Sequence, residues 1–159
     1  MGREAVVNFL HKVTLCVTLC SCWHTPGYET ARPSSQDDAV IDEAVRAHDE
    51  VVGNGSRCSR QRRHVRVAYL DDPELATACR TQPGRVDGCH TTQHGACFPN
   101  RCSHVLVVRA SLPPERRDRV LVHEAMHWLD ECTFGIEYPD NDHKDPLWNR
   151  AVELARERL

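Results

Sequence analysis

The chain has neither an excess of positive charge nor a long apolar run. Its 159 residues carry a formal net charge of −3, which argues against a protein built mainly to hold nucleic acid. The apolar run near the N-terminus, Val13 to Cys20, is too short to span a bilayer. With 27% charged and 40% hydrophobic residues, the composition is that of one globular domain plus a tail, not of a disordered or membrane-spanning chain.

Aromatic residues are absent from the one dense basic cluster. Five arginines fall between positions 57 and 66, a density that would suit a phosphate-binding patch. No aromatic side chain is interleaved there to stack on bases. A solvated basic loop that leads into a strand is therefore the simpler interpretation, and we expect no nucleic-acid partner.

Residues 1–22 predict an export signal. Arg3 and Lys12 precede the short apolar run, as in signal segments. The run ends in Leu19-Cys20-Ser21-Cys22, which resembles a bacterial lipobox, whose last Cys is lipid-modified after cleavage. Cys22 would then anchor the chain to a membrane. We expect an exported protein, either a cell-envelope lipoprotein or a secreted one, with an ordinary N-terminal helix as the alternative.

Six of the nine cysteines lie in the body of the chain. They are Cys58, Cys79, Cys89, Cys97, Cys102 and Cys132. An even number suits three disulfides in an oxidising compartment, although six cysteines allow 15 pairings. A second, structural zinc site is the competing interpretation for the cluster Cys89, His90, His94, Cys97, Cys102 and His104. Its spacing fits no common zinc knuckle, so disulfides are favoured.

The domain is expected to occupy residues 37–159, after a flexible tether over residues 23–36 that is rich in Pro, Ser, Thr and Gly. Apolar residues at helical spacing predict a first helix from Asp37 to the turn at Gly53. Alternation predicts a strand over His64–Leu70, and a more continuous apolar run predicts a deeply buried strand over Ser103–Leu112.

Between these two strands we expect a long loop stapled by disulfides. A helix should start at Pro113-Pro114 and end at Gly135, and a last helix should open at Pro146. These elements predict an α+β fold in which a small β-sheet backs the helix over 113–135.

That helix carries the sequence His123-Glu124-Ala125-Met126-His127. Two histidines four residues apart lie on one helix face and can point their imidazole nitrogens at one zinc ion. The glutamate lies beside the ion, where it can take a proton from zinc-activated water and pass it to a leaving amine. We therefore predict one Zn²⁺ per chain and Glu124 as the general base of a peptide-bond hydrolase.

A catalytic zinc needs a third protein ligand and an open fourth position. Metzincin-type sites require Gly and His where this chain has Asp130 and Thr133, which excludes that class. Gluzincin-type sites take a Glu from a following helix, for which Glu153 is the candidate.

The segment Asp142–Trp148 resembles the second motif of SprT-like and related minimal zincins. In that family HExxH is followed by a His at the start of another helix, with large apolar residues four and five positions later, here Leu147 and Trp148. The resemblance implies a zincin-like fold, His143 as third ligand and peptide-bond hydrolysis. The family usually has a small residue where this chain has Lys144. Its cytosolic members act near DNA, which an export signal would contradict, so the family's substrate is not assigned to this chain.

The sequence thus predicts a zinc metallopeptidase that acts on a peptide or protein substrate, with ligands His123, His127 and His143. The alternative is a non-catalytic zinc-binding envelope protein that serves as a binding or structural module. Retention of Glu124, which a structural site does not require, favours the enzyme. Asp130 and Glu131 are candidates to orient the ligating histidines, and Tyr138 and His104 are candidates to stabilise the oxyanion.

Overall fold

The described residues form an α+β fold with a three-stranded sheet, as predicted. The computed structural model describes residues 28–53, 58, 61–94, 102–135 and 142–159. The sheet consists of β1 (Val65–Leu70), β2 (Gly88–His94) and β3 (Cys102–Arg109). Its order is β1-β3-β2, in which β1 runs parallel and β2 antiparallel to the central β3.

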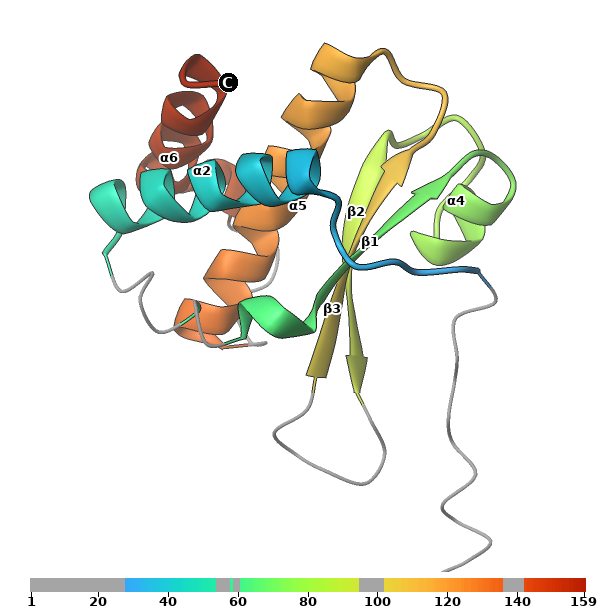
Figure 1. The fold of residues 1–159 in the computed structure, drawn as a ribbon, viewed down its shortest axis with the longest axis horizontal. Helices are drawn as coiled ribbons and strands as arrows, with labels where there is room; N and C mark the ends of the chain where they lie inside the picture. The colour runs from blue at the N-terminus through green and yellow to red at the C-terminus, as the bar shows by residue number, and fades with distance from the viewer. Residues whose placement is uncertain (1–27, 54–57, 59–60, 95–101, 136–141) are drawn as a thin grey trace, which may run out of the picture.

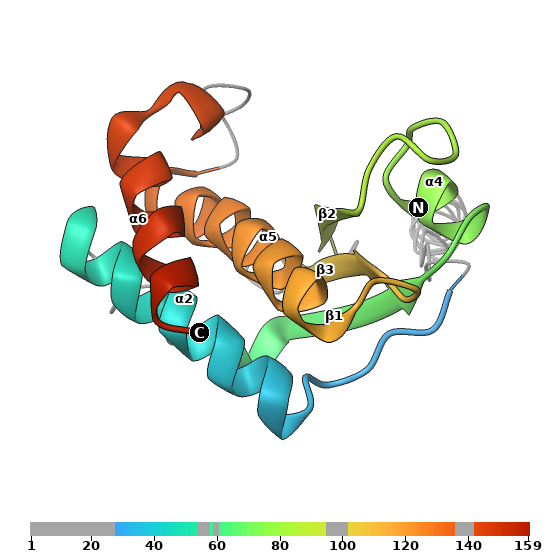
Figure 2. The same ribbon diagram turned by 90° about the horizontal axis from the view of Figure 1, so that it is seen from above.

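Helices cover both faces of this sheet (Figure 1). Helix α5 (Pro114–Phe134) packs against one face, and α2 (Ser35–Val51) and α6 (Pro146–Glu157) pack against α5 (Figure 2). The short helix α4 (Glu74–Ala78) lies on the opposite face of the sheet. Helix α5 is therefore enclosed between the sheet and the other two long helices.

The central strand explains why the sheet is buried on both sides. All four side chains from Val105 to Val108 are fully buried. Leu106 and Val108 face α5, whereas Val105 and Val107 pack with the residues around α4. A strand that is covered on both faces shows no alternation of polar and apolar residues. The deep burial that was predicted from the sequence of β3 is therefore confirmed.

The helix ends follow local chemistry. Ser34 and Asp37 form a reciprocal capping box that starts α2. Helix α5 has Pro in its first turn and ends at Gly135, whose φ of 94° suits glycine. Asp145 caps α6 through the backbone N–H of Leu147. The three predicted helices are thereby confirmed, with α2 starting two residues early.

The expected long loop between the two predicted strands is wrong in two respects, because that segment contains the short helix α4 and also strand β2. Its sequence, GCHTTQH, lacks the apolar alternation by which strands are recognised. Backbone pairing with β3 over seven residues stabilises it instead. Within the predicted tether, Ala31 pairs with Val67 of β1 through two backbone hydrogen bonds of 3.0 Å.

Two disulfides connect elements in the part of the chain that the structure describes. Cys79–Cys89 joins the end of α4 to β2, and Cys58–Cys132 ties the chain after α2 to the last turns of α5. The 74-residue separation of the second pair corresponds to about 4 kcal/mol in the loop-entropy model. Disulfides of this kind fit an oxidising compartment. Among the described helices, none is long and apolar enough to cross a membrane.

Candidate metal centre

The imidazole rings of three histidines converge beside α5: His123, His127 and His143. The Nε2 atom of His123 lies 3.2 Å from Nε2 of His127 and 3.2 Å from Nε2 of His143. Ligand nitrogens roughly 2.0–2.1 Å from a tetrahedral zinc are about 3.3 Å apart. One nitrogen from each residue lies within 4.8 Å of the others. The donor set and its spacing therefore fit a zinc ion, and the exposed ring of His143 leaves one side open to solvent.

Burial keeps the first of these rings uncharged. Burial, reinforced by the neighbouring His127 and His143, lowers the pKa of His123 to about 3. A neutral imidazole is the form that ligates a metal. His123 is therefore ready to bind a cation without first losing a proton at neutral pH.

Trp148 of α6 supports all three rings. Its indole is only 3% exposed, and its ring centroid lies 5.1 Å, 5.3 Å and 5.0 Å from those of His123, His127 and His143. The Asn149 side chain also donates hydrogen bonds of 3.1 Å to the carbonyls of His143 and Asp145. The ring of His143 is thus held by Trp148, and the backbone from His143 to Asp145 is held by Asn149.

Glu124 lies beside the histidines and is almost fully buried. It is 5% exposed, and burial raises its pKa to about 8 against the opposing effect of a hydrogen bond from the backbone of His90. A carboxyl group placed so deeply is costly unless something compensates for it. A nearby divalent cation would favour the carboxylate form.

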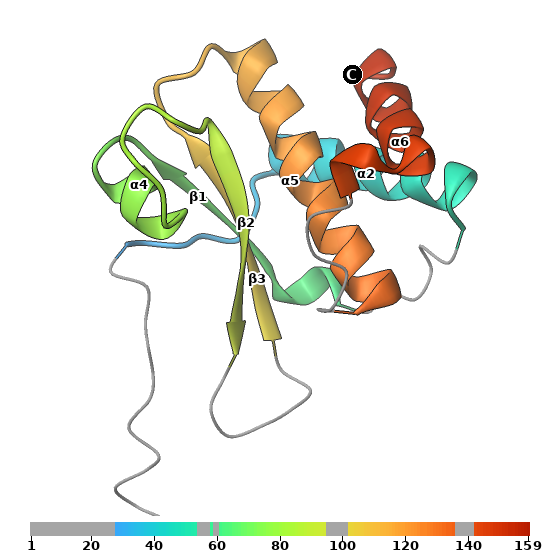
Figure 3. The ribbon, with the colours of Figure 1, turned by 180° about the vertical axis from the view of Figure 1, so that it is seen from behind.

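A cleft of about 410 Å³ runs along α5 and opens beside the triad. Residues of α5 (His123, Glu124, His127 and Glu131) form one wall and β2, with Gly88 to His90, forms the other. Figure 3 shows β2 along the outer edge of the sheet next to α5. An edge strand and the predicted site therefore face the same space.

Gly88 lets β2 approach Glu124 closely. A Cβ atom at this position would lie 2.6 Å from the side chain of Val120, 2.7 Å from the backbone oxygen of Val107 and 3.1 Å from Oε1 of Glu124. The first two distances are shorter than real contacts allow. Only glycine fits here without moving the strand.

Gly88→Ala is expected to destabilise the fold by roughly 1–3 kcal/mol, because an overpacked side chain must displace β2 or α5. Thermal or urea unfolding measures this change. Gly84→Ser is the matched control, since that glycine has open space around it but a positive φ, so it tests backbone strain without crowding. A smaller loss in Gly88→Ala than in the control would contradict the close approach.

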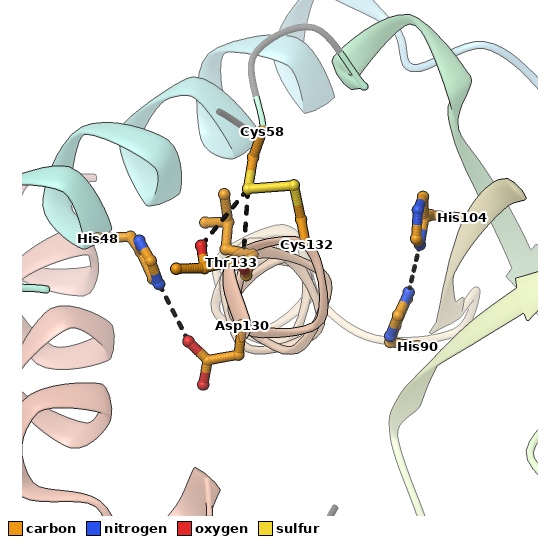
Figure 4. Close-up of a disulfide and its surroundings, with 8 residues drawn as sticks. His48, Cys58, His90, His104, Asp130, Cys132 and Thr133 are labelled. Carbon is orange, nitrogen blue, oxygen red and sulfur yellow. Dashed lines mark hydrogen bonds and ion pairs between the residues drawn. A yellow bond between two sulfur atoms is a disulfide. The ribbon is translucent and has the colours of Figure 1, made fainter. Parts of the chain in front are cut away.

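The two carboxylates expected to orient the ligands lie on different sides of α5. Asp130, which is buried, binds Nε2 of the fully buried His48 at 3.0 Å and so joins α2 to α5. Glu131 instead accepts a 2.6 Å hydrogen bond from the Thr92 hydroxyl of β2. Figure 4 shows Asp130 directed toward His48 and away from the sheet.

A second cluster of potential ligands lies farther along the same cleft. Nε2 of His90 is 3.2 Å from Nδ1 of His104, and Nδ1 of His90 is 3.6 Å from Oε2 of Glu131. One atom from each of these three residues lies within 4.8 Å of the others. Burial, with the nearby His104 and His127, lowers the pKa of His90 to about 3.

The remaining candidates have different positions. Glu153, the alternative ligand, is exposed on α6 and lies outside both His/Glu clusters found in the described part of the chain. His104 is 4% exposed, and His90 rather than His104 lines the cleft. Cys89 is bonded to Cys79 and so is not free to ligate zinc. Tyr138, Cys97 and the predicted signal with Cys22 lie outside the described residues.

Sequence reasoning missed the need for glycine at position 88 and the position of Glu131 beside His90 and His104. A clue to Glu131 was available, since His123, His127 and Glu131 are four residues apart and so share one helix face. No protein-family model matches the chain, and neither a curated protein nor a solved structure shows significant similarity to it. What the chain does must therefore be inferred from its own side chains.

Proposed function

We propose that the chain is a zinc-dependent metallopeptidase with a zincin-like fold. The observation that supports this most directly is the convergence of three imidazole nitrogens beside a buried glutamate in an open cleft. His123, His127 and His143 would hold the ion. When bound there, zinc would acidify an attacking water and polarise the carbonyl of the scissile peptide bond.

The proposed role of Glu124 is proton transfer. Its carboxylate accepts the proton of the attacking water and delivers it to the nitrogen of the leaving amine. A zinc site that only stabilises a fold does not need such a group, and burying a carboxyl group until it is only 5% exposed would be costly there. Glu124 therefore favours the enzyme over the non-catalytic zinc-binding module.

The outer edge of β2 suggests how a peptide would bind. Among the described residues, antiparallel β2 pairs with β3 along one side only, and its residues Gly88 to His90 line the cleft. An extended peptide can add to such an edge through backbone hydrogen bonds. We propose that the substrate lies between β2 and the histidine triad, with its scissile bond next to Glu124.

The proposed compartment is outside the cytoplasm. The two disulfides support an oxidising environment, and the sequence of residues 1–22 supports export, with Cys22 as a lipid anchor or with free secretion. In that setting a peptide or protein of the cell envelope or its surroundings is the proposed substrate.

Removal of metal tests this function. The purified chain is expected to cleave members of a broad peptide library, to lose cleavage when a chelator removes its metal, and to regain it with Zn²⁺ but not with Mg²⁺, which prefers oxygen ligands. Metal analysis and mass spectrometry of the peptides provide the measurements. Zinc bound without any cleavage would favour the binding module, and no bound zinc would exclude both functions.

A further inference from the structure

We propose that His90, His104 and Glu131 form a second metal site, separate from the triad, that takes a divalent transition-metal ion. Its ligand atoms come from three elements, β2, β3 and α5. The ion would join the edge of the sheet to the helix that carries His123 and His127.

The spacing of the two histidines matches that of the triad. Their facing nitrogens are 3.2 Å apart, the same separation as between His123 and each of its two partners in the triad and close to the value of about 3.3 Å for two nitrogens on a tetrahedral zinc. The two rings are nearly parallel, at 20°. Figure 4 shows them meeting nitrogen to nitrogen.

The sheet register holds these side chains on one face. Thr92 pairs with His104 in the antiparallel ladder, and His90 is two residues from Thr92, so all three side chains point to the same side of the sheet. Leu106, on the same face as His104, belongs to the core cluster against α5. Glu131 lies on α5, which packs on this face, and contacts Thr92 and His90.

The Thr92 side chain orients Glu131 without being a ligand itself. The Thr92 hydroxyl donates a 2.6 Å hydrogen bond to Oε2 of Glu131. This hydrogen bond fixes the direction of the carboxylate, as groups that hydrogen-bond to metal ligands commonly do. Its side chain is 17% exposed and that of His90 is 8% exposed. Both side chains are thus largely withdrawn from solvent, where the attraction between a carboxylate and a bound cation is screened less than at the surface.

The ligand set selects the class of ion. Two imidazoles and one carboxylate suit Zn²⁺, Co²⁺ or Fe²⁺ more than Mg²⁺ or Ca²⁺, which prefer oxygen. Because His90 and Glu131 line the cleft, an ion can enter from solvent. Four residues advance a helix by about 6 Å, so Glu131 lies one turn beyond His127 and the second ion would occupy the next stretch of the same cleft.

Co²⁺ titration of the metal-free full chain tests the proposal, with stoichiometry from calorimetry and coordination from visible absorption. Wild type should bind two equivalents. Glu131→Gln and His143→Ala should each bind one, and the double variant should bind none tightly. The exposed Glu153→Gln is the matched control and should bind two. Circular dichroism checks folding, and His90→Gln replaces Glu131→Gln if that variant does not fold.

A single equivalent in wild type that His143→Ala removes and Glu131→Gln does not affect would overturn the second site, and the cluster would then be a hydrogen-bonded network. Two equivalents in both wild type and Glu131→Gln would overturn it as well. One equivalent lost in Glu131→Gln, with no effect of His143→Ala, would support the second site while refuting the triad of the proposed function.

Discussion

Glu124→Gln is expected to lower the rate of peptide hydrolysis by roughly 10²–10⁴-fold, the usual contribution of a general acid–base group. Gln has nearly the same shape as Glu, so the geometry of the cleft should survive. It cannot accept the proton of the attacking water. Initial rates on one cleaved peptide, measured at equal zinc content, give the comparison.

The same substitution should leave zinc binding unchanged, because Glu124 is beside the triad and not part of it. It should also leave the free energy of unfolding equal or higher, since it removes an ionisable group that is 5% exposed. Glu115→Gln, in the exposed first turn of the same helix, is the control and should retain full activity. Undiminished hydrolysis in Glu124→Gln would show that another group moves the proton.

Features that depend on neighbours in sequence were predictable. Helix α5 follows from its apolar pattern, its N-terminal prolines and Gly135, and the four-residue spacing of His123 and His127 fixes their common face. His143 was expected to lie beside these two histidines from the resemblance of Asp142–Trp148 to the second zincin motif, and its ring does lie with theirs. Trp148 is indeed buried against the three rings.

Features that depend on pairing across the chain were not predictable. Strand β2 has a polar sequence, and what stabilises it is its ladder with β3 and the disulfide at Cys89. The need for glycine at position 88 arises only when β2 meets Val120 and Glu124 of α5. For the same reason, the position of Glu131 beside His90 and His104 was not predictable, because Glu131 is 27 residues beyond His104 in sequence and no local spacing rule connects them.

His143→Ala is expected to weaken zinc binding at the triad by more than about 100-fold, since even the loss of a group that only orients a ligand typically costs 10–100-fold. Only His123 and His127 would remain, and two imidazoles leave half of a tetrahedral shell to water. Because His143 is exposed, the substitution should hardly change the stability of the metal-free fold. Competition with a chelating dye measures the affinity.

Variants of Glu153 and Lys144 show whether His143 or Glu153 is the third ligand. Glu153→Ala removes the gluzincin-type candidate, and Lys144→Ala changes the residue next to His143 without removing a ligand. If the triad is correct, both variants retain the zinc of the triad and hydrolysis, whereas His143→Ala loses hydrolysis and the zinc of the triad. Loss of zinc in Glu153→Ala with retention in His143→Ala would transfer the third position to α6, and Trp148 would then support His143 for packing alone.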